Sequence, residues 1–383
     1  MKVSMKYLAR ITVALGFLSF FTSSEVQASR ARNLVMGSGD GNTYLDLGGS
    51  GGSFFYNSPY NIFYNPALIT SFGNWAIIEK SNFVESTPNY DANKQFNPSV
   101  PGSVHSGDTA QGGFIMAVLQ FRLAMFFNRV AAIDSVYENR TNFRPIDIIF
   151  GAEAATYKWG FGLTYGSYRG NQIGRDATNT SDVTTGKKES DMDLTLRAGA
   201  VWMDLEPFVA AKVIGSEKTV NPKQSYQDYR AGVKYTYGEW MPIVAYKFVK
   251  SGPHRGHTYG FGLGRATRIS EPVKLIMSLG WWHKYRMAQQ YLPIAMAVEG
   301  EVLSWLTLRG GLTYYILSRS GDTTTADNTS GRLGATFRLG DLDFDFAVGK
   351  TIAGGAEPGA VADAQNFDLS NGLFSAASLS YRW

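Results

Sequence analysis

The chain has 383 residues, no cysteine and a formal net charge of +4 at pH 7. The absence of cysteine excludes disulfides, thiolate metal sites and a cysteine nucleophile, and the weak positive charge gives no argument for a nucleic-acid partner. A closed β-structure can exceed the usual length of one domain, so this length is compatible with a single large domain.

Residues 1–28 have the pattern of a secretory signal peptide. A leader with three basic residues precedes an apolar stretch at 11–21, and residues 26–28 have the form of a small-residue cleavage site. The apolar stretch is too short to span a bilayer as a helix. Removal of this segment takes away three basic residues and one acidic residue, which lowers the formal net charge from +4 to +2. We therefore expect an exported protein.

Residues 29–74 are rich in glycine and serine, yet they also carry many aromatic side chains. A disordered tail would rarely carry so many aromatic residues, so the composition predicts a segment that packs against something. Its candidate apolar contacts are Phe54, Phe55, Phe63, Leu68, Ile69 and Phe72. Within the run FYNPALITSF, Pro66 lacks a backbone donor and favours an extended Asn65. This pair therefore predicts a turn that leads into a short apolar stretch.

Two chemical patterns are weak. The glycines around Ser50 fit the G-x-S-x-G pattern of serine hydrolases, but that pattern requires a strand-to-helix elbow with a histidine and an acid nearby. His254 and His257 fall in a predicted loop, and no further ligands have the spacing of a metal site. We therefore predict no enzymatic activity, no metal and no cofactor.

From residue 75 onward, segments of about ten residues alternate apolar and polar side chains and end in turns. In the last segment Leu379, Tyr381 and Trp383 share one face, while Ser380 and Arg382 share the other. The alternation predicts sixteen strands, near 75–84, 111–119, 121–130, 146–156, 159–169, 191–202, 206–216, 227–237, 241–250, 258–268, 272–283, 292–303, 305–317, 331–339, 342–350 and 373–383. Strands of about 9–11 residues have the length that crosses a bilayer at a tilt.

Lipid tolerates no open sheet edge, so such strands are expected to close into a transmembrane antiparallel up-and-down β-barrel. Short turns alternate with longer polar stretches, which is typical of outer-membrane barrels with the short turns in the periplasm. The longer stretches are 85–110, 131–145, 170–190, 217–226, 251–257, 284–291, 318–330 and 351–372. An even number of strands would keep both chain ends on the same side of the membrane.

The tryptophans fit this arrangement. Trp75, Trp159, Trp202, Trp240, Trp305 and Trp383 fall at the predicted periplasmic strand ends, and Trp281 and Trp282 fall near the other rim. Indole is apolar but has one donor that prefers water, so aromatic girdles form at both membrane interfaces. We therefore expect the tryptophans to belong to two such girdles.

Residues 112–130 leave the number of strands open. No turn residues separate the two strands predicted there, and a single plug segment or short helix in their place would leave fourteen strands. Gln120 and Arg122 in the middle make this segment a poor membrane helix.

The polar faces of the strands direct charged side chains into the predicted lumen. The residues expected to line it are Arg197, Arg230, Arg309, Arg338, Asp343 and Asp345. Buried charges need partners, so these residues either pair with one another as a hydrated lining or form a mildly basic conduit for anions. The relative heights of the side chains in the barrel distinguish the two alternatives.

The string Asn65-Pro66-Ala67-Leu68-Ile69-Thr70 follows a glycine-rich segment and stands just before the first strand. In this position it resembles the FadL/TodX family of outer-membrane transporters, as does the terminal Trp383, a feature of most outer-membrane barrels. The resemblance implies that residues 29–74 are a hatch inside the lumen, shaped by Asn65, Pro66 and Ala67, and that residues 75–383 form the barrel. Members of the family have fourteen strands, fewer than predicted here. They take up long-chain fatty acids or aromatic hydrocarbons and release them through a hatch rearrangement and a lateral opening.

The sequence therefore favours a multi-pass protein of the bacterial outer membrane that takes up hydrophobic small molecules passively. A general porin with a hydrophilic pore and a structural barrel that binds a partner protein are the alternatives. The expected partners are outer-membrane lipids and a hydrophobic ligand, with no nucleic acid, and a monomer is favoured. The loops 85–110, 170–190 and 351–372 are expected to form the outer entrance, yet no motif in them names the substrate.

Overall fold

The structure is a computed structural model. It describes residues 29–37, 52–86, 104–129, 145–175, 182–217, 224–251, 254–284, 289–320, 323–324, 329–351 and 374–383. The predicted signal peptide, residues 1–28, and Ser50 lie outside the described residues. Among the residues described, no helix is long and apolar enough to cross a membrane.

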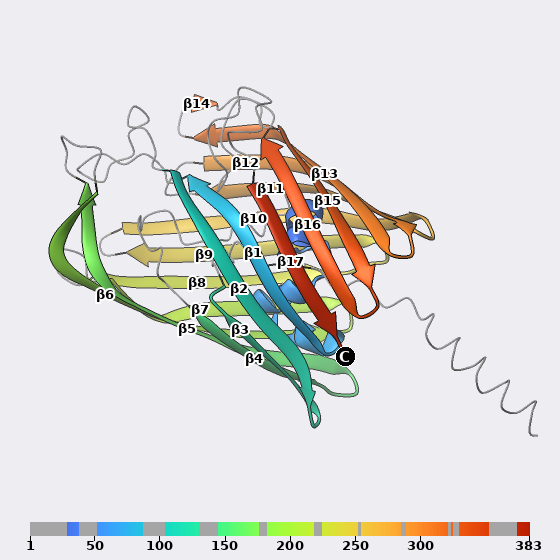
Figure 1. The fold of residues 1–383 in the computed structure, drawn as a ribbon, viewed down its shortest axis with the longest axis horizontal. Helices are drawn as coiled ribbons and strands as arrows, with labels where there is room; N and C mark the ends of the chain where they lie inside the picture. Colours follow the sequence, from blue (N-terminus) through green and yellow to red (C-terminus); the bar gives the residue numbers. More distant parts are fainter. Residues whose placement is uncertain are drawn as a thin grey trace, which may run out of the picture.

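Sixteen antiparallel strands form the barrel wall in the described part of the chain (Figure 1). They are β1 (Trp75–Ser86), β2 (Val104–Val118), β3 (Phe121–Phe127), β4 (Ile146–Glu153), β5 (Tyr157–Arg175), β6 (Asp182–Trp202), β7 (Leu205–Glu217), β8 (Gln224–Tyr235), β9 (Trp240–Ser251), β10 (His254–Ser270), β11 (Val273–Lys284), β12 (Gln289–Leu303), β13 (Leu306–Ser320), β15 (Thr329–Leu339), β16 (Leu342–Thr351) and β17 (Phe374–Arg382). The two-residue β14 (Thr323–Thr324) pairs only with the end of β13. Each wall strand pairs with its neighbour in the sequence, and β1 pairs with both β2 and β17. The sheet therefore closes without an open edge.

The sixteen-strand prediction is confirmed, and the fourteen-strand alternative is wrong. Residues 112–130 contribute to β2 and β3, which are joined by a tight turn at Leu119 and Gln120. Leu119 has a φ of 56° and is 96% exposed. Two-residue hairpins require this left-handed backbone and usually place glycine or asparagine there, so a leucine in that position gave no turn signal in the sequence.

Several strands extend beyond their predicted ends. β5 reaches Arg175 and β6 begins at Asp182, so these two strands take up most of the stretch 170–190 that was predicted as a loop. β10 begins at His254, which places His254 and His257 on a strand. The prediction of loops was therefore wrong for residues 170–175, 182–190 and 254–257, because a ladder of backbone hydrogen bonds does not require apolar side chains; residues 176–181 and 252–253 lie outside the described residues.

Side chains along the wall alternate between an apolar outer face and an inner face of small, polar and aromatic residues. Phe161, Val244 and Leu333 are 50%, 61% and 64% exposed, as expected for an outer face that is solvated by lipid. Trp202, Trp240, Trp305 and Trp383 are exposed beside short turns. Trp75 and Trp282 are fully buried on the inner side, so the prediction that they belong to the girdles was wrong.

The N-terminal residues 29–37 and 52–72, named here the inner segment, lie on the inner side of the wall (Figure 1). They form a short α-helix, α2 (Arg30–Met36), and two 3-10 helices, η2 (Pro59–Phe63) and η3 (Pro66–Ser71). Helix α2 lies against β12, β13 and β15–β17, whereas η3 lies against β3–β6. The inner segment therefore reaches two separate parts of the wall.

Candidate functional site: the inner segment and the barrel wall

Aromatic side chains of the inner segment form a buried cluster with aromatic residues of the wall. The ring centroids of Phe63 and Phe126 on β3 are 5.1 Å apart, and those of Tyr64 and Phe208 on β7 are 5.3 Å apart. Tyr60 meets Trp75 at the start of β1 edge-on at 6.3 Å. Edge-to-face contacts at these separations are favourable beyond the burial of apolar area, so this cluster holds the segment against several strands at once.

The Asn65-Pro66-Ala67 motif begins η3. The Asn65 side chain accepts a hydrogen bond from the Ala67 amide at 3.1 Å and donates one to the Ala200 carbonyl on β6, also at 3.1 Å. Pro66 occupies the first helical turn, where its missing N–H leaves no unmade bond. The predicted turn is therefore a capped 3-10 helix, and Asn65 both starts the helix and links it to the wall.

Two paired glycines allow this close approach. Gly160 on β5 and Gly199 on β6 face one another across the ladder. A Cβ atom on Gly160 would lie 2.4 Å from the backbone carbonyl of Pro66, and one on Gly199 would lie 1.9 Å from Asn65 Oδ1. Neither position was predicted from the sequence, although a glycine inside a strand is a known signal for close approach of another backbone.

The six predicted apolar contact residues are all enclosed. Relative exposure is at most 9% for Phe54, Phe55, Phe63, Leu68, Ile69 and Phe72. Phe55 lies over Gly264 on β10, where a Cβ would come within 2.3 Å of its ring, and Ile69 lies against Gly151 on β4. These residues contact the wall and one another, so they leave little surface open to solvent.

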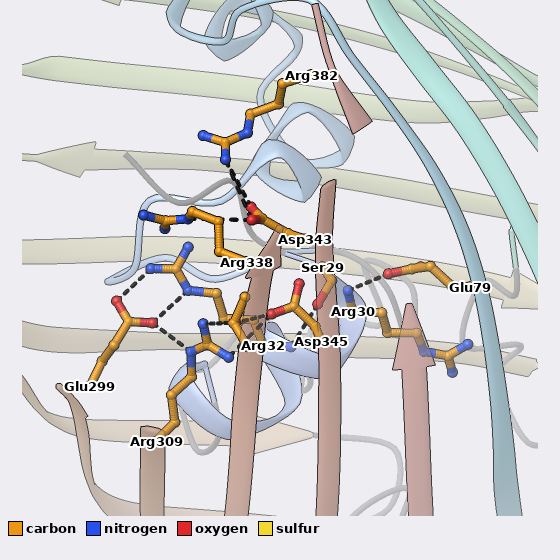
Figure 2. Close-up of polar contacts among 11 residues, drawn as sticks. Ser29, Arg30, Arg32, Glu79, Glu299, Arg309, Arg338, Asp343, Asp345 and Arg382 are labelled. Carbon is orange, nitrogen blue, oxygen red and sulfur yellow. Dashed lines mark hydrogen bonds and ion pairs between the residues drawn. The ribbon is translucent and has the colours of Figure 1, made fainter. Parts of the chain in front are cut away.

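Helix α2 is held by charged groups (Figure 2). Arg32 donates to Glu299 on β12 through Nε at 2.6 Å and Nη2 at 2.5 Å. Arg309 on β13 donates to the same carboxylate at 2.6 Å and lies 3.3 Å from Asp345 on β16. Two guanidinium groups thus share the Glu299 carboxylate, and Arg309 also pairs with Asp345. Removal of one member of a buried ion pair leaves an uncompensated charge, so the stability of this cluster depends on all of its members.

The start of α2 is tied to β1 and β2 through Glu79. Ser29 caps the helix by accepting a hydrogen bond from the Arg32 amide at 3.1 Å, and the Arg30 amide donates to Glu79 Oε1 at 2.6 Å. The other Glu79 oxygen accepts hydrogen bonds from the Tyr60 hydroxyl and from Gln111 on β2. Burial raises the pKa of Tyr60 well above 10.0, and the neighbouring Glu79 carboxylate raises it further. One carboxylate therefore joins α2, η2 and two strands of the wall.

Further charged residues of the inner face also form ion pairs. Asp147 on β4 lies 2.9 Å from Arg129 and 3.5 Å from Arg197 on β6, and the Arg129 guanidinium lies over the Phe63 ring at 3.9 Å. On β8, Asp228 accepts from Arg230 at 2.8 Å. On β16, Asp343 accepts from Arg338 at 3.4 Å and lies 3.3 Å from Arg382.

The six predicted lining residues, Arg197, Arg230, Arg309, Arg338, Asp343 and Asp345, thus lie on the inner face in ion pairs. Five further charged sites of the inner side were not predicted from the sequence: Glu79, Asp147, Asp228, Arg129 and the arginines of α2. Strand alternation could have found Asp147, which stands between Ile146 and Ile148 on the opposite face. Nothing in the sequence indicated that Arg32 and Glu299, which lie 267 positions apart, would meet.

No protein-family model matches the sequence, and no curated protein matches it. A bacterial polysaccharide outer membrane secretin has a TM-score of 0.48 at 8% identity, with coverage of 81% of this chain and 98% of that chain. A Pseudomonas aeruginosa FadL homologue has a TM-score of 0.38 at 13% identity, with coverage of 87% and 96%. A porin refined at 1.8 Å resolution has a TM-score of 0.41 at 10% identity, with coverage of 81% and 99%. This likeness concerns the barrel fold alone.

Proposed function

We propose that the protein is an outer-membrane channel for passive uptake of hydrophobic small molecules, such as long-chain fatty acids or aromatic hydrocarbons, and that the inner segment is its hatch. The observation that carries the proposal is the aromatic cluster that joins Phe63 and Tyr64 of the inner segment to Phe126 and Phe208 of the wall. A sixteen-stranded barrel would otherwise enclose an aqueous channel. An apolar segment that fills this channel favours apolar compounds as the transported ligands.

The apolar outer face supports an outer-membrane location. Lipid-exposed backbone is tolerated only when every strand is paired, and the closed sheet meets this condition. The driving force for ligand entry would be burial of apolar surface, worth about 25 cal/mol per Å². When the hatch shifts, the apolar side chains of η2 and η3 would become available to the ligand. No bond is made or broken in this scheme, and it needs no cofactor and only one chain.

A disulfide that locks the hatch tests this proposal, because the natural chain has no cysteine. The pair Asn65→Cys and Gly199→Cys is suited to it, since a Cβ on Gly199 would lie 2.8 Å from Asn65 Cγ and 3.3 Å from its Cα. We expect the oxidised double variant to lose uptake of a labelled fatty acid into cells or vesicles, and a reductant to restore it. The Asn65→Cys variant under the same oxidant is the control, because Gly199→Cys alone would place its Cβ 1.9 Å from Asn65 Oδ1. Uptake that is equal in the oxidised and reduced states would contradict the hatch.

A general porin is the second candidate, and the charged inner face of the wall favours it. Arg230 and Lys212 are half-buried, and their ion pairs with Asp228 and Asp193 give this wall the polarity of a hydrated pore. Planar-bilayer recordings separate the two functions. The full-length protein is expected to give little steady conductance while the hatch is docked. A large steady conductance would favour the porin.

A further inference from the structure

The outer face of β8–β11 changes character in steps from one end of the barrel to the other. At the end of the barrel opposite the turns at 238–239 and 271–272, Lys250 on β9 stands across the ladder from Arg255 on β10 and Gln227 on β8. The next row holds Tyr229, Phe248 and His257, which also pair across the ladder. Cationic side chains thus form the outermost described row of this face, and aromatic side chains follow directly beneath it.

The aromatic rows are in contact with one another. The Phe248 and His257 ring centroids are 5.1 Å apart, and the Tyr246 hydroxyl is hydrogen-bonded to His257 Nδ1 at 2.7 Å. Farther along the face, Tyr259 lies 5.7 Å from Trp281 and 5.2 Å from His283 on β11. Below these rows the outer face is apolar, with Val244, Phe261 and Leu263 exposed. Rings with polar tips above an apolar band are the arrangement expected where a membrane surface meets water.

The length of this face matches a bilayer. Ten residues separate Arg255 from Arg265 along β10. With a rise of about 3.4 Å per residue and a tilt of about 40°, they span roughly 26 Å, close to the apolar band of about 25 Å on membrane barrels. Arg265 lies over the Trp240 ring at 5.3 Å, at the end with the short turns. The two arginines therefore mark the two membrane surfaces.

The two rims differ in charge. Arg265 lies 2.8 Å from Glu239, so the cation at the short-turn rim is neutralised by a carboxylate. At the other rim, the described outer-face residues of β8–β11 include Lys250 and Arg255 but no carboxylate. Basic side chains near a membrane surface attract anionic lipids, with about 1 kcal/mol for each Lys or Arg. Among the described outer-face residues of β8–β11, the excess of positive charge that faces lipid therefore lies at the rim with Lys250 and Arg255.

We propose that Lys250 and Arg255, with the aromatic rows beneath them, bind the phosphorylated headgroup of a lipid in the leaflet at this rim. The phosphates would contact the two cations, while the acyl chains would lie over Phe248, Tyr259 and Trp281. A lipid is favoured over a soluble anion because the cations stand directly above aromatic rows and then an apolar band. The inference rests on the membrane location in the proposed function, but not on uptake or on the hatch.

Native mass spectrometry of the full chain in a mild detergent tests the inference, with diphosphorylated lipid A and dephosphorylated lipid A as the two probes. We expect the double variant Lys250→Gln with Arg255→Gln to bind the diphosphorylated lipid about 25-fold more weakly than the natural chain. This corresponds to about fivefold for each cation, since about 1.4 kcal/mol is a factor of ten. The dephosphorylated lipid is expected to bind both proteins equally.

Two further variants complete the test. Arg265→Gln removes a cation at the opposite rim and is expected to leave lipid binding unchanged, whereas the exchange Lys250→Arg with Arg255→Lys is expected to retain it. Equal binding of the phosphorylated lipid by the natural chain and the double variant would overturn the inference. If a folded protein inserts into phosphatidylcholine vesicles and shows no preference for phosphate, only the lipid site fails. If it inserts into no vesicle, the proposed membrane location fails as well.

Discussion

The inner segment is held at two places by different kinds of interaction. Helix α2 is held by charged groups, of which Arg32, Glu299 and Arg309 share hydrogen bonds on the inner side of β12 and β13. Helix η3 makes no ion pair among the described contacts of Asn65–Ser71, and rests instead on glycines of β5 and β6 and on the aromatic cluster. The attachment of α2 therefore requires every charged partner to be present, whereas the attachment of η3 requires the surfaces of the helix and the wall to fit closely.

This difference predicts which part of the inner segment moves more easily. Close packing is lost in small increments when side chains shift, and dispersion forces are weak individually. A buried ion pair, by contrast, leaves an uncompensated charge as soon as one partner departs. We therefore expect η2 and η3 to move while α2 remains attached, so that α2 acts as the fixed end of the hatch.

The largest effect is expected from Gly160→Val. A Cβ at this position would lie 2.4 Å from the Pro66 carbonyl and 2.6 Å from the Ala67 amide nitrogen. Both are backbone atoms, so no rotamer change relieves the overlap and η3 has to leave its place. Hydrogen exchange of a peptide that covers residues 59–72 is expected to lose its protection, while exchange in α2 stays slow.

Gly310→Val is the matched control, because a Cβ on Gly310 would meet only the side chains of Leu333 and Val298, at 3.8 Å. Valine suits a strand in both variants, so the barrel itself is expected to keep its heat-modifiable mobility on a gel. If η3 stays protected in Gly160→Val, the close approach of Pro66 to β5 is wrong.

The next largest effect is expected from Glu299→Gln at the charged attachment. Arg32 would then lose the carboxylate that it binds, while Arg309 would keep Asp345, and an unbalanced buried pair costs about 3–5 kcal/mol. Exchange of α2 is expected to become at least about two orders of magnitude faster, with a smaller change in η3. Glu239→Gln, which breaks an exposed ion pair with Arg265 at a turn, is the control and is expected to change neither helix. Equal acceleration of α2 and η3 would show that the two attachments act as one.

The two attachments also differed in how far the sequence could predict them. Alternation over about ten residues was enough for the strands, because one face must meet lipid and the other the lumen. The same alternation placed Arg309 and Asp345 inside, and the Asn65-Pro66 step predicted the break before η3. The partner of each inner charge depends on which strands lie beneath α2. The closure of the sheet determines which strands these are, and the local sequence pattern does not show it. For this reason Glu79 and Arg32 escaped prediction.

The direction of aromatic side chains was a second limit. Trp75 stands at a strand end beside the short turns, as a girdle residue would, yet it is buried against Tyr60 and Phe126. Position along a strand gives height in the membrane, whereas the face is given by the pleat alone. At the first strand the adjacent Ile77 and Ile78 leave the pleat undecided in the sequence. In the structure Ile78 is 70% exposed and Ile77 is buried, so Trp75, on the same face as Ile77, faces the lumen.

The smallest effect is expected from pH, at the point where both attachments meet. Tyr60 of η2 donates its hydroxyl hydrogen bond to Glu79, which also accepts from the first amide of α2. Burial holds the pKa of the docked Tyr60 well above the 10.0 of an exposed phenol. Docking is therefore fully stable below pH 10 and weakens as the pH rises, because the undocked phenol loses its proton first. At pH 10 the loss is about 0.4 kcal/mol, since half of the undocked phenol is then ionised.

Hydrogen exchange of residues 59–72 at pH 8 and pH 10, corrected for the intrinsic exchange rate, measures this loss. Tyr60→Phe has no ionisable group at this position and is expected to show no comparable change between the two pH values. The change is expected in η2 first, because Tyr60 belongs to it, and in α2 only through the shared Glu79. If α2 loosens as much as η2 while Tyr60→Phe prevents both changes, the carboxylate of Glu79 couples the two attachments, and the fixed end of the hatch is then not independent of its moving part.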